Sequence, residues 1–86
     1  MLFTRSNKFK KNLNNLPEKI QRKTFERLNL FNVDQFESIL NNHSLHGEYL
    51  GCRSINVSGD LRIIYKKISD TACLLVDIGT HSQLFG

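Results

Sequence analysis

Two stretches near the start of the chain repeat apolar residues at the three- and four-residue spacing of a helix. Ser6 is a suitable N-cap for the first helix, and Pro17 fits the first turn of the second, where its missing N–H costs nothing. The second helix is expected to end near Phe31. The residues on the two predicted helix faces are Phe9, Leu13 and Leu16, then Ile20, Thr24, Leu28 and Phe31. These patterns predict a helical hairpin, which a short β-compatible segment at Leu2 to Thr4 precedes.

A shorter apolar stripe follows this predicted hairpin. Asn32 and Asp34 are residue types that often cap helices, and they stand at its start. The stripe consists of Val33, Phe36, Ile39 and Leu40, and it stops at Asn41-Asn42. This spacing predicts a short third helix.

The period then changes to the alternation that is typical of β-strands. From about Tyr49, the apolar residues Ile55 and Val57 alternate with polar neighbours. Ser58-Gly59-Asp60 has the composition of a hairpin turn, and a β-rich run from Leu61 to Ile68 follows it. The alternation predicts neighbouring antiparallel strands in a sheet.

One more strand and a glycine complete the pattern. Ser69-Asp70 forms a second turn, and Ala72 to Ile78 predicts a strand that is buried on both faces apart from Asp77. Gly79 lets the chain turn before a last short extended segment. We therefore expect an α+β fold in which an N-terminal strand and a helical hairpin pack on one face of a twisted antiparallel sheet. The other face stays available for a ligand.

Length and composition suit a single domain that spans residues 1–86. Hydrophobic residues make up 40% of the 86 residues, which is enough for one small core. The formal net charge is +4 at pH 7, and residues 1–31 contain eight Lys or Arg against two Glu. This surplus favours a polyanionic partner such as RNA, DNA or phospholipid, although it also fits a solvated basic surface.

No segment has the pattern of a membrane span or of a zinc site. A span needs roughly 20 consecutive apolar residues, and four Lys or Arg between Arg5 and Lys11 occupy the region where a signal peptide is apolar. A cytoplasmic protein is therefore expected. Cys52 and Cys73 lack CxxC spacing, so we expect free, part-buried thiols and no metal or other cofactor.

Three separated blocks of sequence share their order and spacing with a known family. The blocks are Asn42-His43-Ser44-Leu45-His46-Gly47, Ser58-Gly59-Asp60-Leu61-Arg62-Ile63-Ile64-Tyr65 and Gly79-Thr80-His81-Ser82-Gln83-Leu84-Phe85-Gly86, preceded by Phe9-Lys10-Lys11 with Leu13. Together they resemble the signature of YafQ-like toxins in the RelE/ParE superfamily. The resemblance implies a type II toxin, an mRNA interferase that cuts messenger RNA in the ribosomal A site and is held inactive by a cognate antitoxin.

Two of the three histidines have places in this signature. His43 lies in a predicted loop, and an imidazole that titrates near pH 6.5 can act as a base or an acid. Without the resemblance, a surface histidine bonded to a neighbouring carbonyl is the simpler interpretation; the resemblance implies a catalytic role. His81 follows a strand end, and the resemblance makes it the first choice for a catalytic histidine. His46 is expected to be a surface side chain or an RNA contact.

Asp60, Arg62 and Phe85 complete the catalytic set that the resemblance implies. Asp60 either holds a catalytic histidine in one tautomer or takes part in proton transfer, or it is an ordinary turn residue. Arg62 shares a strand face with Ile64 and Lys66, and its guanidinium fork suits the extra charge of a phosphorane-like transition state. Phe85 either closes the core or stacks on a splayed-out base, a contact worth about 1–3 kcal/mol.

Further residues are expected to contact messenger or ribosomal RNA. They are Lys8, Lys10, Lys11, Arg53, Asn56 and Lys66. Strict alternation places Arg53 on the same side as Ile55, as an edge ion-pair residue, unless a bulge reorients it. Asn56 stands where YafQ-like members often have a histidine, and an amide cannot exchange a proton at pH 7. Catalysis then falls to His43 and His81, or it is slower, or it is absent.

Two other functions fit the same pattern. A ParE-like toxin has the same fold and binds gyrase, but the retained histidines argue against this function. A module that binds RNA or protein without catalysis is the third hypothesis, and Asn56 is its best support. Tyr65 does not discriminate between them, because its ring is expected to pack in the sheet with a wet hydroxyl.

Overall fold

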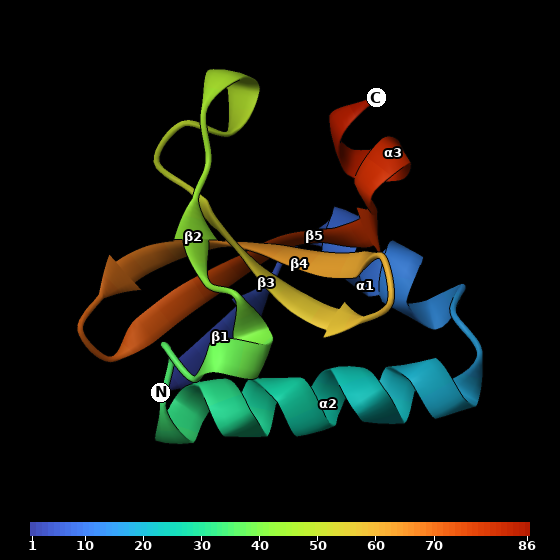
Figure 1. Ribbon diagram of the computed structural model, residues 1–86, viewed down its shortest axis with the longest axis horizontal. Helices are drawn as coiled ribbons and strands as arrows, with labels where there is room; N and C mark the ends of the chain where they lie inside the picture. Colours follow the sequence, from blue (N-terminus) through green and yellow to red (C-terminus); the bar gives the residue numbers. More distant parts are fainter.

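Five strands form one twisted sheet in the computed structural model, which describes residues 1–86 (Figure 1). They are β1 (Leu2–Arg5), β2 (His43–Ser44), β3 (Arg53–Ser58), β4 (Leu61–Ser69) and β5 (Ala72–Thr80), in the order β1-β5-β4-β3-β2 across the sheet. The pairings from β2 to β5 are antiparallel, as expected. Strand β1 lies parallel to β5, so the sheet is mixed rather than wholly antiparallel. A parallel neighbour needs a long connection, and the whole chain between β1 and β5 provides it.

Three α-helices and two 3₁₀ turns connect the strands. They are α1 (Asn7–Asn14), α2 (Glu18–Val33), α3 (His81–Phe85), η1 (Ser38–Leu40) and η2 (Gly47–Tyr49). The Ser6 hydroxyl caps α1 by accepting a hydrogen bond from the Phe9 N–H at 3.0 Å. Pro17 directly precedes α2, so the predicted helical hairpin is confirmed. None of these helices combines the length and the apolar content that crossing a membrane requires.

The main core lies between α2 and the sheet, because α2 runs along one face (Figure 1). Its buried side chains include Phe9, Leu13, Leu28, Phe31, Leu40, Ile55, Val57, Ile63, Tyr65, Leu75 and Ile78. A second cluster on the opposite face contains only Leu45, Ile64 and Leu84 as buried members. That face is therefore covered only in part, by the segment after β2 and by α3. The thiols of Cys52 and Cys73 are free, as predicted.

The predicted third helix is not formed. Only η1 exists in that region, and Leu40 is its one buried residue, while Val33 is 85% and Phe36 is 64% exposed. Asp34 is extended and ends α2, and its carboxylate accepts a hydrogen bond from the Phe36 N–H at 3.0 Å. Such an Asx turn competes with helix, so an apolar stripe at this position does not become a buried helix face.

The last segment is the helix α3 rather than an extended strand. The Thr80 hydroxyl accepts a hydrogen bond from the Gln83 N–H at 3.3 Å, and the Gln83 side chain accepts one from the Thr80 N–H at 2.8 Å. This reciprocal pair is a capping box, which starts a helix directly at the end of β5. Residues 81–85 therefore rise from the sheet instead of continuing it.

Asp77 is buried, which contradicts the prediction that it is the exposed residue of β5. It is 3% exposed, and its Oδ1 accepts hydrogen bonds from the Asn12 amide at 2.7 Å and from the Ile78 N–H at 2.8 Å. Its Oδ2 lies 3.3 Å from the Lys8 ammonium. A buried carboxylate is stable only with such partners, so Asp77 fastens α1 to β5.

Replacing Asp77 by alanine is expected to lower the free energy of unfolding by about 2 kcal/mol, because Asn12 and the Ile78 N–H lose their acceptor. Urea unfolding measures this. The control is Asp70→Ala, which removes an exposed carboxylate and is expected to change stability by less than about 0.5 kcal/mol. Equal stability of the two variants would contradict the role of Asp77.

The same contact predicts a pH dependence. The hydrogen bond to Asp77 raises the pKa of Lys8 above its ordinary value of 10.5. The contribution of the pair is therefore complete at pH values below 10.5, and it is lost as the pH rises through the raised pKa.

Candidate active site

A cleft of about 330 Å³ opens on the face of the sheet opposite α2. Its walls are the segment after β2 and α3, which both rise from this face (Figure 1). The lining residues are His43, Leu45, His46, Arg62, His81 and Phe85. Four of the five residues predicted to be catalytic therefore line one cleft, and Asp60 lies at its edge through its contacts with two of them.

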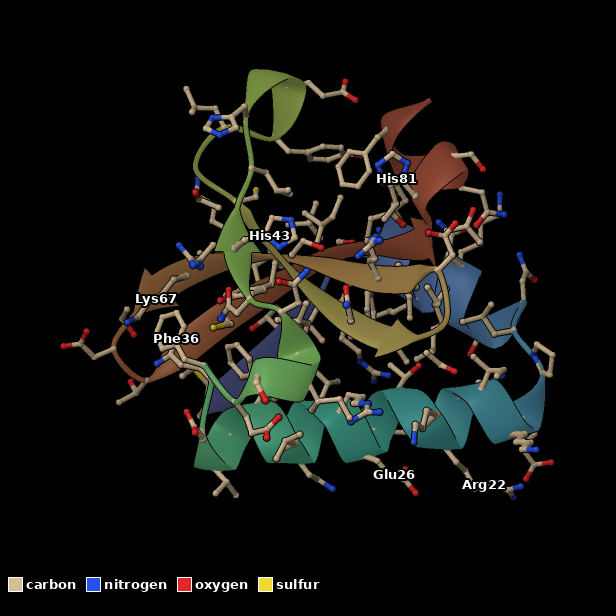
Figure 2. The ribbon with its side chains drawn as sticks, in the orientation of Figure 1. Arg22, Glu26, Phe36, His43, Lys67 and His81 are labelled. Atoms are coloured by element: carbon tan, nitrogen blue, oxygen red, sulfur yellow. The ribbon has the colours of Figure 1, made fainter.

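His43 comes from β2, where it is exposed and paired with Ser54 of β3. Its Nδ1 lies 2.7 Å from the carbonyl oxygen of Asn41. A carbonyl only accepts, so this contact requires a proton on Nδ1, and in the neutral imidazole Nε2 is then the acceptor. His43 thus presents the form of imidazole that can take up a proton. Figure 2 shows His43 and His81 on the same side of the sheet, from elements far apart in the sequence.

Arg62 lies opposite Asn56 in the β3–β4 ladder. Its guanidinium donates a hydrogen bond to the Asn56 side-chain oxygen, and its second terminal nitrogen lies 3.7 Å from the Asp60 carboxylate. The Nε–H is buried and has no partner. A buried unpaired donor is rare in folded proteins, and here it belongs to a side chain that lines the cleft.

Asp60 contacts the backbone of His81 and not its imidazole. Its Oδ2 accepts a hydrogen bond from the His81 N–H at 3.2 Å, while Oδ1 faces Arg62. The carboxylate therefore ties the start of α3 to the strand that carries Arg62. This geometry assigns Asp60 a positioning contact, and the prediction that it selects a histidine tautomer has no contact to support it.

Phe85 stands between two other aromatic rings. The His81 ring, four residues earlier on α3, lies 5.0 Å away between ring centroids, and the Tyr49 ring meets Phe85 edge-on at 5.8 Å. Phe85 is 38% exposed, so it does not close the core. Sequence reasoning missed Tyr49 and placed His46 outside the site. The available signal was that His46 belongs to the same block as His43 and that Tyr49 follows this block closely in sequence.

Arg53 lies on the other face of the sheet, away from the cleft. Its Nε donates to the Asn42 side-chain oxygen at 2.8 Å, and its guanidinium carbon lies 5.6 Å from the centre of the Phe36 ring. Strict alternation is confirmed, because the register shift in β3 comes only after Asn56. The Tyr65 hydroxyl also donates to Asn42, at 3.0 Å, so the prediction of a wet hydroxyl was wrong.

The lysines predicted to contact RNA lie outside the cleft. Lys66 is exposed on the strand face of Arg62 but farther along β4, and Lys8 pairs with Asp77. Lys10 and Lys11 are exposed on α1. No three His, Cys, Asp or Glu side chains meet in a group that could hold a metal ion.

The sheet order and the partly open face define a small α+β fold, and solved structures share it. YafQ from E. coli strain BL21(DE3) has a TM-score of 0.82 at 23% identity, with 98% of this chain and 97% of that chain covered. A YoeB/ParE toxin from Agrobacterium tumefaciens has a TM-score of 0.77 at 13% identity, with 94% and 99% covered. The E. coli DinJ–YafQ complex has a TM-score of 0.72 at 25% identity, with 98% and 97% covered.

The family follows from the sequence itself. The model described as "Bacterial toxin of type II toxin-antitoxin system, YafQ" matches residues 1–86. The chain therefore belongs to the YafQ family of type II toxins, as the three sequence blocks predicted. The comparison with curated proteins gave no match.

Proposed function

We propose that this toxin is an endoribonuclease that cuts messenger RNA in the ribosomal A site. The observation that carries the proposal is the meeting of His43, Arg62 and His81 in one cleft. Cleavage by attack of the 2′-OH on the scissile phosphate needs a base, an acid for the leaving 5′-oxygen, and cationic donors around the phosphorane-like transition state. Two imidazoles and one guanidinium are the groups that supply these functions at neutral pH.

The free Nε2 of His43 suits it to proton transfer at the cleft. Arg62 is already fixed by Asn56 and Asp60, so it needs little reorganisation to stabilise charge on the phosphate. Its unpaired Nε–H is the donor that a phosphate oxygen would satisfy. Asn56 thus contributes by holding Arg62. His43 and His81 share the roles of general acid and general base.

Phe85 provides a ring face for a nucleotide base beside these groups. It is partly exposed at the cleft, and edge contact with Tyr49 restricts its orientation. Single-stranded RNA is recognised largely through splayed-out bases that stack on such rings. This arrangement suits a messenger strand whose bases are unpaired.

A cognate antitoxin is the second partner that we propose. In the E. coli complex, YafQ is bound to DinJ. A toxin of the same family needs a comparable partner to remain inactive in the cytoplasm. Co-expression with the product of the neighbouring reading frame is expected to restore growth, and growth arrest that persists would count against that partner.

Primer extension on translated messenger tests the nuclease proposal. Induced expression is expected to give codon-phased cuts, which vanish in Arg62→Ala and His81→Ala. Phased cuts that persist unchanged in both variants would refute this site. Intact messenger together with blocked supercoiling would instead indicate a gyrase inhibitor.

The exposed lysines of α1 are expected to contact ribosomal RNA. Binding to ribosomes should weaken as the salt concentration rises, and it should weaken further in Lys10→Glu plus Lys11→Glu, because each phosphate contact releases counterions. Sedimentation with ribosomes over a salt series measures this. Lys67→Glu, near the end of β4, is the control and should have a smaller effect. Salt-insensitive binding would contradict the expectation.

A further inference from the structure

The turn before β2 has the only non-glycine residue of the chain with positive φ. This residue is Asn41, with a φ of 46°. Asparagine is one of the few residue types that tolerate the left-handed region. In this conformation the Asn41 carbonyl oxygen lies 2.7 Å from His43 Nδ1. The tautomer of His43 therefore depends on the shape of this turn.

Asn42, the next residue, anchors the turn on the opposite face of the sheet. Its side-chain oxygen accepts hydrogen bonds from Arg53 Nε at 2.8 Å and from the Tyr65 hydroxyl at 3.0 Å. Its side-chain nitrogen donates to the Gln35 carbonyl at 2.9 Å and to the Tyr65 hydroxyl at 2.8 Å. Adjacent residues of an extended segment point to opposite faces, so His43 can face the cleft while Asn42 is held among these partners.

The partners of Asn42 are themselves rigid. Tyr65 is 1% exposed, and its ring packs edge-on against Phe31 with 5.0 Å between centroids. Arg53 pairs with Tyr65 across the β3–β4 ladder and lies over the Phe36 ring. Burial raises the pKa of Tyr65, so its hydroxyl remains a neutral donor at physiological pH. The anchor is thus built into the main core.

We propose that Asn42 and Tyr65 are positioning residues that hold His43 from the far side of the sheet, with its proton on Nδ1 and Nε2 free at the cleft. The effect of these residues on cleavage rests on the proposed nuclease function, whereas their effect on the tautomer of His43 does not. It gives a functional role to a hydroxyl that sequence reasoning treated as structural. It also assigns Arg53, which was predicted to contact RNA, the role of supporting the same turn through Asn42.

The tautomer of His43 can be measured directly by ¹⁵N NMR of the imidazole nitrogens, with the whole protein and no RNA. The parent protein should give a protonated Nδ1 and an unprotonated Nε2 for His43. Asn42→Ala and Tyr65→Phe should each give a mixture of tautomers, while the signals of His81 stay unchanged. Asn42→Asp keeps an acceptor oxygen for Arg53 and Tyr65 but loses the N–H that Asn42 donates to Gln35, so it should keep more of the single tautomer than Asn42→Ala does.

Cleavage kinetics provide the second measurement. Both disruptive variants should lower kcat about tenfold and leave KM unchanged, because a misplaced base affects the chemical step and not RNA binding. Asn29→Ala, an exposed asparagine of α2 without a side-chain hydrogen bond, is the matched control and should behave as the parent. Tyr65→Phe retains the buried ring, so it decides the question if Asn42→Ala does not fold.

The outcomes separate this proposal from the nuclease proposal. An unchanged His43 tautomer in both disruptive variants would overturn the positioning role, whatever the cleavage rates. A tautomer that changes as expected in a protein that cuts no messenger would support the anchor and count against the nuclease function.

Discussion

Replacing Arg62 by alanine is expected to slow messenger cleavage about 100- to 1,000-fold while the protein remains folded. This is the usual cost of removing one pre-oriented donor from a charged transition state. Arg62 is pre-oriented because Asn56 and Asp60 hold two of its nitrogens and the third has no partner. Single-turnover cleavage of a ribosome-bound messenger measures the loss, and thermal unfolding verifies the fold.

Two further variants identify the origin of this loss. Arg62→Lys retains the charge but not the planar fork, so it should recover only part of the rate. Lys67→Ala removes a charge from the same strand at an exposed position that pairs only with Asp70, and it should leave cleavage unchanged. A rate for Arg62→Ala within twofold of the parent would exclude Arg62 from the reaction.

Periodicity predicted the elements whose burial it reflects. The apolar residues of α1 and α2 have helical spacing because one face of each helix packs in the core, as Phe9, Leu13 and Leu28 do. The apolar residues of β3 alternate because one side of the strand faces the core, as Ile55 and Val57 do. The helical hairpin, the central strands and the α+β class follow from this. In each case the local pattern and the tertiary contact agree.

The incorrect predictions concern segments whose structure is determined by a local polar contact or by a partner that is distant in sequence. The stripe that starts at Val33 has helical spacing, but the Asp34 carboxylate forms a turn and leaves the stripe exposed. The capping box of Thr80 and Gln83 is a sequence signal for α3 that hydrophobicity does not reveal. The parallel pairing of β1 with β5 joins the two ends of the chain, and no local pattern encodes it.

For the site, the family resemblance provided what periodicity could not. Three strands, β3 to β5, lie between His43 and His81 along the chain, and only the fold brings the two imidazoles to one cleft. Alternation placed Arg53 on the side of Ile55 and Arg62 with Ile64 and Lys66, and the pairing of β3 with β4 brings these two sides to opposite faces of the sheet. The contact of Asp60 with a backbone N–H and the anchor at Asn42 depend on side-chain geometry that sequence alone does not contain.

The three histidines allow a test of which imidazoles act in proton transfer. His43→Ala and His81→Ala are each expected to lower the cleavage rate about 100- to 10,000-fold, which is the usual range for one general acid or base. His46 lines the same cleft but has no contact that fixes its ring, so His46→Ala should lose less than about tenfold.

The double variant His43→Ala plus His81→Ala sharpens the assignment. Base and acid act on one transition state, so the combined loss should be smaller than the product of the two single losses. Independent, fully multiplicative losses would indicate that one histidine acts in RNA binding instead. A single-turnover comparison at saturating messenger separates these cases, because a binding defect disappears at saturation and a chemical defect does not. Asn56 cannot transfer a proton, so it would not compensate for the missing imidazoles.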